Sequence, residues 1–276
     1  MYDVVLLTLG GGCGAPRVPV LACADVLTAA GASVQTVTAE SDAEIDSTLD
    51  GRRLVVAAAT DGQLRAVMRR MVRRYAPAPS KRPADLPADR TVPDLPPVGV
   101  LPLDPTADDL AAQLDLPRDP AEVAKAVLGD KVRRLDLLRN DGGSVTLDGA
   151  LVGGERGAWR GRVEVDDAVL SDGSDPILAC AVGNGAGYTR LDGLPLLTTP
   201  DPADGVIEVA VAVPVVVQRL LRRPRGRIEV RRARGRAVAV TPRDSEVGYV
   251  DDGVSGTLSH KRSWWIEPGA WAVYVR

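Results

Sequence analysis

The first half of the chain alternates between short apolar runs and segments with apolar residues at every third or fourth position. The runs predict buried strands, and the spaced pattern predicts helices. The predicted strands lie at 4–9, 33–38, 54–59 and 98–101, and the predicted helices at 18–30, 43–49, 63–75, 106–114 and 120–128. Strands that alternate with helices form a parallel sheet with right-handed crossovers. We therefore expect an α/β nucleotide-type domain over residues 1–130.

From residue 131 onward, short strands separated by Asp-Gly turns replace this alternation. The predicted strands lie at 133–137, 145–147, 161–165, 177–182, 205–213, 227–230, 237–241 and 271–275. This pattern predicts an antiparallel β-sandwich or barrel domain over residues 131–276, with the last strand returning to the first domain. The fold class is thus α/β plus all-β.

Residues 76–97 interrupt the first domain with seven prolines set among charged residues. Such a composition is typical of an extended or mobile surface loop. A solvated insertion is the simpler interpretation. A lid is the alternative, because the loop leaves and re-enters beside the strand ends where ligands of parallel sheets bind.

Composition narrows the classes of partner. The 276 residues carry a net charge of −3, which favours no nucleic-acid partner. The three cysteines form no CxxC pair and indicate neither a zinc site nor a disulfide framework. No stretch is long and apolar enough to span a bilayer. We expect a cytoplasmic protein that meets any lipid peripherally, with a homodimer left open.

Carboxylates follow two of the predicted strands. The run 54–59 leads into Asp61-Gly62 at a helix start, and 98–101 leads into Pro102-Leu103 and the pair Asp108-Asp109. The carboxyl ends of parallel strands meet at one sheet edge, so these side chains are expected to lie close together. Two strands that each deliver a carboxylate beside a helix start can hold a nucleotide phosphate and its metal.

The chain resembles the diacylglycerol kinase catalytic family, including the bacterial soluble lipid kinases, whose motifs read roughly GGDGT and PLGTxND. The resemblance rests on the order of Val98-Gly-Val-Leu-Pro-Leu103, Thr106-Ala-Asp-Asp-Leu-Ala-Ala112, Leu116-Pro-Arg-Asp-Pro-Ala-Glu122 and Val132-Arg-Arg-Leu-Asp-Leu137. It implies a lipid-kinase-like fold with ATP and Mg²⁺ as cofactors. It also implies an active site in the cleft between the two domains and γ-phosphoryl transfer to a lipid hydroxyl.

The nucleotide motifs have changed in this chain. GGDGT reads Ala59-Thr-Asp-Gly-Gln63, PLGTxND becomes Pro102-Leu-Asp-Pro-Thr-Ala-Asp-Asp109, and the first loop lacks the family's Asn. The resemblance assigns nucleotide or phosphate binding to matching positions: Gly11, Gly12, Asp61, Gly62, Thr106 and Asp109. Asp104 or Thr106 can equally serve only as a helix cap.

Two motifs of the second domain are also altered. The family's DGE motif reads Asp252-Gly-Val254, so Asp252 is the implied catalytic base, beside Asp61 as the other catalytic carboxylate, and the Glu is lost. In 200–205, Asp201 and Asp204 match a turn that binds a structural Mg²⁺ in some members. A plain Asp-Gly turn is an equal alternative there.

Other signals are weaker. Gly10, Gly12 and Ala15 fit a dinucleotide fingerprint, but Glu40 follows at a slightly long spacing. The single histidine, His260, has no nucleophile elbow to serve. An arginine run over 222–236 is either a solvated hairpin face or a surface for anionic lipid.

Three functions follow from these motifs. The first is a diacylglycerol kinase-like protein with degenerate motifs that lacks lipid kinase activity and binds a lipid or apolar small molecule in the interdomain cleft, with or without a cofactor. The second is an active ATP-dependent kinase for a lipid or small-molecule hydroxyl. The third is a reused cleft that performs other chemistry on an apolar metabolite. Changes at all of the motifs favour the first and third.

Overall fold

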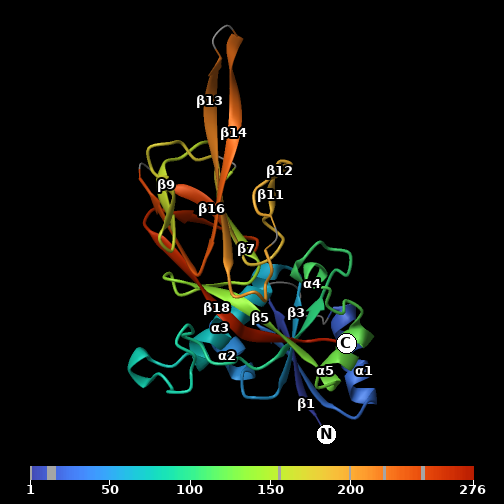
Figure 1. Ribbon diagram of the computed structural model, residues 1–276. Helices are drawn as coiled ribbons and strands as arrows, with labels where there is room; N and C mark the ends of the chain where they lie inside the picture. Colours follow the sequence, from blue (N-terminus) through green and yellow to red (C-terminus); the bar gives the residue numbers. More distant parts are fainter. Residues whose placement is uncertain (1, 11–16, 155–156, 199, 220–221, 244–245) are drawn as a thin grey trace. The chain divides into compact units, whose positions relative to one another are not determined.

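The computed structural model describes residues 2–10, 17–154, 157–198, 200–219, 222–243 and 246–276; for residues 79 and 216–226 only the backbone is considered. The chain divides into two compact units (Figure 1). Unit 1 comprises Met1–Asp136 and Glu267–Arg276, and unit 2 comprises Leu137–Ile266. Unit 1 is therefore assembled from two segments that are distant in sequence.

Unit 1 is built on a sheet with strand order β2-β1-β3-β4-β18, in which β1 to β4 run parallel. The strands are β1 (Asp3–Leu9), β2 (Ser33–Ala39), β3 (Arg53–Ala58), β4 (Val98–Pro102) and β18 (Arg262–Tyr274). β18 adds to β4 in parallel at Val273 and Val98. A parallel sheet covered on both faces needs continuous apolar strands, which explains the runs at β1, β3 and β4.

Five α-helices of unit 1 are α1 (Val18–Ala29), α2 (Asp42–Thr48), α3 (Asp61–Tyr75), α4 (Leu110–Gln113) and α5 (Pro120–Leu128). One core cluster joins α1 and α5 to the sheet through Val20, Leu27, Val123 and Val127. The predicted helix at 106–114 is wrong in length, because Asp109 caps a helix of only four residues. The turns at 104–109 hold the rest of that segment.

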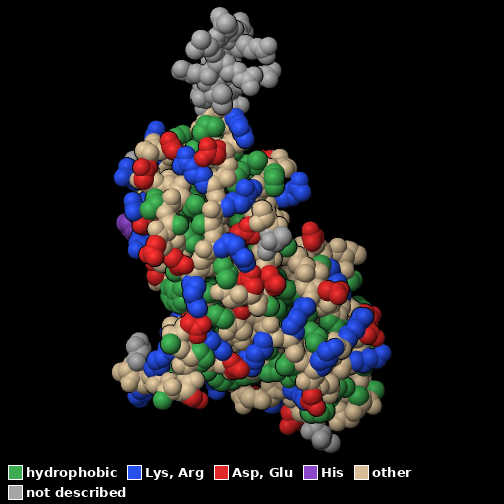
Figure 2. Space-filling model, viewed as in Figure 1, with side chains coloured by type: hydrophobic (Ala, Val, Ile, Leu, Met, Phe, Trp, Pro, Cys, Tyr) green, Lys and Arg blue, Asp and Glu red, His purple; other side chains and the backbone are tan. Residues whose placement is uncertain are grey.

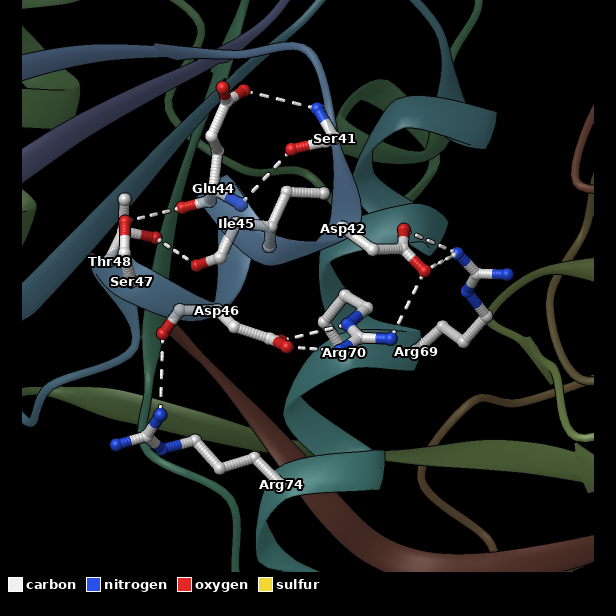
Figure 3. A network of polar contacts seen from close by, with 10 residues as sticks. All are labelled: Ser41, Asp42, Glu44, Ile45, Asp46, Ser47, Thr48, Arg69, Arg70 and Arg74. Carbon is white, nitrogen blue, oxygen red and sulfur yellow. Dashed lines mark hydrogen bonds and ion pairs between the residues drawn. The ribbon is translucent and has the colours of Figure 1, made fainter.

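Helices α2 and α3 are joined by charged side chains (Figure 3). Ser41 and Glu44 form a reciprocal capping box at the start of α2. From α3, Arg70 donates its Nε to Asp46 at 2.8 Å and an Nη to Asp42 at 3.1 Å. The guanidinium of Arg70 is largely buried, so this network fixes α2 against α3 beside the ends of β1 and β2.

The Pro-rich segment 76–97 is anchored in unit 1. It contains a short 3-10 helix, Pro79–Lys81, and otherwise consists of turns and coil. The fully buried Glu267 of β18 accepts hydrogen bonds from the backbone N–H groups of Thr91 and Val92, at 2.6 and 3.2 Å. Val92 and Leu95 are buried. The end of the segment is thus part of the core, a role that its composition did not indicate.

Unit 2 contains a six-stranded antiparallel sheet in the order β14-β13-β10-β7-β16-β17. Its strands are β7 (Gly149–Gly153), β10 (Ala179–Gly183), β13 (Ile207–Arg219), β14 (Arg222–Gly235), β16 (Val247–Asp251) and β17 (Val254–Leu258). The first half of β18 pairs with a second layer, β15-β8-β9. That layer comprises β15 (Ala237–Pro242), β8 (Gly161–Val165) and β9 (Ala168–Asp172).

One core cluster joins these two layers, with Val163 and Val240 from one and Val152 and Val209 from the other. The remaining strands are β5 (Val132–Asn140), β6 (Val145–Thr146), β11 (Arg190–Leu191) and β12 (Leu194–Pro195). Along the chain, the division between the two units falls inside β5, after Asp136, and again inside β18, before Glu267. The predicted class, α/β followed by an antiparallel β unit, is confirmed.

Candidate functional site

The carboxylate of Asp61 lies at the carboxyl edge of the parallel sheet, in the first turn of α3 with Gly62. The backbone N–H of Leu110, at the start of α4, donates to Asp61 Oδ1 at 3.0 Å. Burial raises the pKa of Asp61, this hydrogen bond opposes the rise, and the nearby charges of Asp109 and Asp108 add to it. The structure therefore brings Asp61 and the 108–109 pair together, as the sequence predicted.

The 104–109 loop is held by hydrogen bonds to its own residues and to Arg118. Asp109 caps α4 by accepting from the backbone N–H of Ala112 at 2.9 Å. Asp104 accepts from both the N–H and the hydroxyl of Thr106, at 2.9 and 2.7 Å. Arg118 donates to the Ala107 carbonyl at 2.6 Å and lies 3.3 Å from Asp109. Thr106 and Asp109 each have a structural hydrogen bond, and their phosphate-binding roles stay predictions.

Gln63 connects the ends of two strands. Its Oε1 accepts from the backbone N–H of Ala59 at 2.7 Å, and its Nε2 donates to the carbonyl of Leu9 at 3.4 Å. The backbone groups at the ends of β1 and β3 are thereby bound by a protein side chain. These are the groups that face a ligand in a parallel-sheet fold.

A hollow of about 370 Å³ lies at the ends of β1 and β2, lined by Leu9, Gly10, Ala39, Glu40, Ser41, Asp42 and Ile45. A Cβ at Gly10 would come within 2.8 Å of Glu40 Cγ, so a larger residue here would displace the Glu40 side chain. Asp42 is paired with Arg69 and Arg70, whereas Glu40 is exposed. Gly11 and Gly12, the other predicted phosphate-binding residues, lie outside the described residues.

Asp252 lies in unit 2, in the two-residue turn between β16 and β17, with φ of 47°. Asp-Gly with both φ values positive is the favoured hairpin turn. The carboxylate is 1% exposed and accepts from the backbone N–H groups of Leu147, Asp148 and Gly149, at 2.7, 2.9 and 3.2 Å. The catalytic role of Asp252 stays a prediction, while its hydrogen bonds give it a structural one.

Burial raises the pKa of Asp252 well above its usual range, and the charge of Asp251 adds to the rise. The N–H groups of Leu147 and Asp148 act in the opposite direction. Tyr188 lies close by, where its hydroxyl accepts from the N–H of Gly253 at 2.9 Å. Burial is also the largest cause of the raised pKa of Tyr188. The positions of Asp148, Tyr188 and Asp252 in the sequence do not predict that these residues form a buried polar cluster.

The two predicted Mg²⁺ ligands of the second domain lie in a turn before β13. Asp201 accepts from the N–H of Ala203 and Asp204 from that of Val206, both at 3.0 Å, and Asp204 also pairs with Arg234. Within the described ranges, no group of three or more His, Cys, Asp or Glu side chains is arranged to hold a metal ion. The metal role of Asp201 and Asp204 stays a prediction.

Unit 2 also contains a cavity of about 190 Å³ with both apolar and polar walls, the polar ones including Glu246 and Ser255. Its walls come from β7, β16, β17 and residues 157–159, and include Leu151, Trp159, Gly248, Tyr249 and Val250. Tyr249 lies over Gly256 on the neighbouring strand, since a Cβ there would meet its ring at 2.6 Å. At Gly248 a Cβ would meet no atom within 4 Å, so this part of the wall is open.

Unit 1 is thus an α/β unit with carboxylates at the carboxyl edge of its parallel sheet, and unit 2 is an antiparallel β unit. Residues 8–140 match the model of the diacylglycerol kinase catalytic domain family. The resemblance inferred from the motifs is thereby confirmed.

Solved structures agree with this assignment at the level of the fold. The chain is similar to a diacylglycerol kinase from Bacillus anthracis, with a TM-score of 0.67 and 13% identity, covering 100% of this chain and 97% of that one. It is also similar to an NAD kinase from Archaeoglobus fulgidus solved in complex with ATP, with a TM-score of 0.55 and 13% identity, over 98% and 93% of the two chains. No curated protein matches the sequence.

The helices of the described part of the chain include none with the length and apolar character that crossing a bilayer requires.

Proposed function

We propose that this protein is a diacylglycerol kinase-type domain that has lost phosphoryl transfer and binds a lipid or another apolar small molecule. The observation that carries the first half of this proposal is Gln63. In the family motif this position is a Thr, and here its amide binds backbone groups of Ala59 and Leu9 at the ends of two strands. A nucleotide would have to displace these hydrogen bonds before its phosphates could approach.

The acidic residues support the same proposal. Asp104 replaces a motif glycine, and Glu40 is an exposed wall residue of the hollow at the ends of β1 and β2. Carboxylates repel the phosphates of a nucleotide unless a cation lies between them. In unit 2, the motif Glu is the exposed Val254, which neither accepts a proton nor binds a metal.

The apolar part of the cavity in unit 2 supports the second half of the proposal. A dry cavity of about 150 Å³ is large enough for benzene, whereas pockets for drug-sized ligands have on the order of 300 Å³ or more. A cavity of about 190 Å³ lined by Leu151, Trp159 and Tyr249 fits a small apolar molecule or the end of one acyl chain. A ligand site in the predicted interdomain cleft remains a separate prediction.

An active kinase is the alternative, and the proximity of Asp61 to Asp108 and Asp109 favours it. In that case Asp61 and Asp109 would hold Mg²⁺ with the ATP phosphates, and Thr106 would contact a phosphate. The charges of Asp109 and Asp108 add to the raised pKa of Asp61, and a divalent cation would stabilise these neighbouring carboxylates. The cation would be the partner that the buried Asp61 requires.

Thermal unfolding with and without nucleotide separates the two functions. A ligand at one hundred times its dissociation constant adds about 2.7 kcal/mol of stability. We expect no shift of the unfolding temperature of the wild type with millimolar Mg-ATP or Mg-ADP, and no transfer of labelled phosphate to dioctanoylglycerol. The variant Ala59→Gly/Thr60→Gly/Gln63→Thr, which restores the GGDGT motif and removes the hydrogen bonds of Gln63 to residues 59 and 9, tests whether Gln63 closes the site. A nucleotide shift in the wild type together with phosphate transfer would contradict the proposal.

The apolar ligand is tested with decanol and decanoic acid as probes. We expect both to raise the unfolding temperature of the wild type and to have no effect on Gly248→Leu, whose side chain would enter the open part of the cavity. The control variant is Val169→Leu, which adds a methylene group at an exposed position of β9. A glycine such as Gly193 is not a suitable control position, because its φ of 80° would strain any leucine placed there. Equal probe effects in the wild type and Gly248→Leu would exclude the cavity as the binding site.

A further inference from the structure

The indole of Trp159 forms part of the wall of the cavity in unit 2, and only 7% of this residue is exposed. Its backbone is fixed opposite Ile177, because the N–H of each residue donates to the carbonyl of the other, at 2.9 and 2.7 Å. Two glycines make room for the ring. A Cβ at Gly153 would lie 2.5 Å from the indole Nε1, and a Cβ at Gly161 would lie 2.4 Å from Cζ3 at the opposite end. The indole is therefore held in one orientation between the end of β7 and the start of β8.

This orientation places the N–H end of the indole at the cavity. Gly153, beside Nε1, lines the cavity, whereas Gly161, beside the other end of the ring, is not among its described lining residues. Within the described part of the chain, Nε1 of Trp159 has no hydrogen-bond acceptor. A buried tryptophan N–H usually has a partner, because an unpaired buried donor is costly. The cavity is the space from which an acceptor can reach this donor.

The cavity lies where two strands of the six-stranded sheet separate. β7 and β16 pair as far as Val152 and Tyr249, and the ladder between them ends at this pair. The next residues on the two strands, Gly153 and Gly248, both line the cavity. Gly153 has a φ of 80°, a conformation that favours glycine, and it turns β7 away from the ladder. The opening is therefore produced by the path of the backbone.

The rest of the wall has a buried part and an exposed part. Trp159 and Val247 are the buried lining residues among those described, and of these two side chains only Trp159 can form a hydrogen bond. Glu246 and Ser255 are exposed and belong to the mouth. The described lining includes no Lys or Arg that would pair with an anionic group. Figure 2 shows acidic and basic side chains interspersed on the visible face, and such a mixture provides no field of one sign that attracts a charged ligand.

We propose that the cavity of unit 2 takes a small uncharged molecule with a carbonyl group, a ketone or an ester, whose oxygen accepts a hydrogen bond from Nε1 of Trp159. This inference rests on the second half of the proposed function, the binding of an apolar molecule in this cavity, and adds the chemical class of that molecule. The hydrocarbon part of the ligand packs against Leu151 and Val247. A carbonyl fits better than a hydroxyl, because a hydroxyl brings its own donor to a buried wall whose side chains offer no acceptor.

Two probes of nearly the same shape test the hydrogen bond. Cyclohexanone and methylenecyclohexane differ only in a C=O against a C=CH₂ group, and both are close in size to benzene, which a dry cavity of about 150 Å³ accommodates. We expect Trp159→Phe, which keeps an aromatic ring and removes the N–H, to bind cyclohexanone about fivefold more weakly than the wild type does. This factor corresponds to one net hydrogen bond. The affinity for methylenecyclohexane should change less, and the ratio of the two changes removes the effect of the altered ring shape.

Trp264→Phe is the matched control. Trp264 is fully buried in the same core cluster, and its Nε1 likewise has no acceptor among the described residues, but it is not part of the described cavity lining. Its substitution should change the affinities for the two probes equally. The indole N–H signals of the ¹⁵N-labelled wild type, which has four tryptophans, give a second measurement. The signal of Trp159 should move downfield with cyclohexanone and not with methylenecyclohexane.

The outcomes separate this inference from the function on which it rests. Equal changes for both probes in Trp159→Phe, together with an unmoved Trp159 signal, would overturn the carbonyl assignment and leave the cavity as a site for apolar molecules. The same selective loss in Trp264→Phe would also overturn it. No binding of either probe to the wild type would overturn both the assignment and the cavity site. Circular dichroism shows whether each variant folds, and if Trp159→Phe does not, the Trp159 signal of the wild type decides.

Discussion

Asp252 carries its carboxyl group into the interior of unit 2, and this placement makes the stability of unit 2 depend on pH. The pKa of Asp252 is raised in the folded state, first by burial and then by the charge of Asp251. The folded state therefore retains a proton that the unfolded chain has released. Stability falls as the pH rises from the ordinary carboxyl pKa of about 4 toward the raised pKa.

Asp252→Asn should reduce this dependence. At pH 5 the variant should be less stable than the wild type, because an amide N–H group would face one of the three backbone N–H groups that the carboxyl accepts from. At pH 8 the difference should shrink, because the wild type then bears the cost of a buried charge. Urea unfolding at pH 5 and pH 8 measures the difference in the free energy of unfolding between the wild type and the variant.

The matched control for this prediction is Asp192→Asn. Asp192 occupies the same left-handed position before a glycine in the β11–β12 turn, but it is exposed. Its substitution should leave the pH dependence of the wild type unchanged. A difference between Asp252→Asn and the wild type that grows toward pH 8 would contradict the expected direction of the pKa shift.

At the residue scale, the sequence predicted that the carboxylates of the candidate site lie together, but it did not predict the hydrogen bonds of Gln63. Asp61 and Asp109 were predicted to meet because both follow parallel strands, and the rule that relates strand ends to one sheet edge is independent of side-chain detail. The hydrogen bonds of Gln63 to Ala59 and Leu9 depend on a rotamer and on the distance between two strand ends. No spacing in the sequence contains that information.

The pair of helices α2 and α3 is the clearest case of an element fixed by polar contacts. Arg70 reaches from α3 to Asp46 and Asp42, and its side chain is 11% exposed. The hydrogen bond from Arg70 is the largest cause of the lowered pKa of Asp46. A lowered carboxyl pKa stabilises the fold above the unfolded pKa, and this stabilisation is lost as the pH falls through the folded pKa.

Arg70→Ala should therefore destabilise the protein by about 1 kcal/mol at pH 7, because half-exposed ion pairs contribute in that range. The difference from the wild type should disappear in acid, once Asp46 is protonated. Arg73→Ala is the control, since Arg73 is exposed on the same helix and makes no hydrogen bond to a described residue. Thermal unfolding from pH 7 down to the pH at which Asp46 is protonated in the folded state follows this loss, and a difference that persists below that pH would assign the effect to packing.

Elements with a strong local pattern were predicted well, and elements that depend on distant partners were not. The apolar runs at β1 and β3 and the amphipathic helix α3 agree with the structure within a few residues. β16 and β17 were missed because the segment 247–258 has little regular alternation. The sheet forms there through the Asp252-Gly253 turn and through pairing of β16 with β7.

At the scale of the whole molecule, unit 1 depends on a segment that follows unit 2. Trp271 of β18 is buried and its Nε1 donates to the carbonyl of Asp136 at 2.8 Å, while the N–H of Leu95 donates to the Ala270 carbonyl at 2.8 Å. Gly269 donates to Asp136 Oδ1 at 2.6 Å. Asp136 and residues 267–269 are therefore close enough for a short linker to join them.

We expect residues 1–136 alone to remain unfolded and residues 1–136 joined through two glycines to 267–276 to unfold cooperatively. The physical reason is that β18 supplies a sheet neighbour for β4 and the buried side chain of Trp271. Trp271→Ala in the joined fragment should cost about 3–5 kcal/mol. Calorimetry of the three fragments provides the measurement. A cooperative transition of 1–136 alone would contradict the dependence on β18.

The discontinuous assembly of unit 1 has a consequence for synthesis on the ribosome. Domains usually fold in the order in which they emerge. Here the residues of β1 to β4 leave the exit tunnel first, yet β18 is translated only after all of unit 2. Until then the apolar strand β4 is an open edge, and such edges invite aggregation. Unit 2 can therefore fold before unit 1 is complete, and the first 136 residues of the nascent chain must be protected from aggregation during that time, by chaperones or by slow collapse.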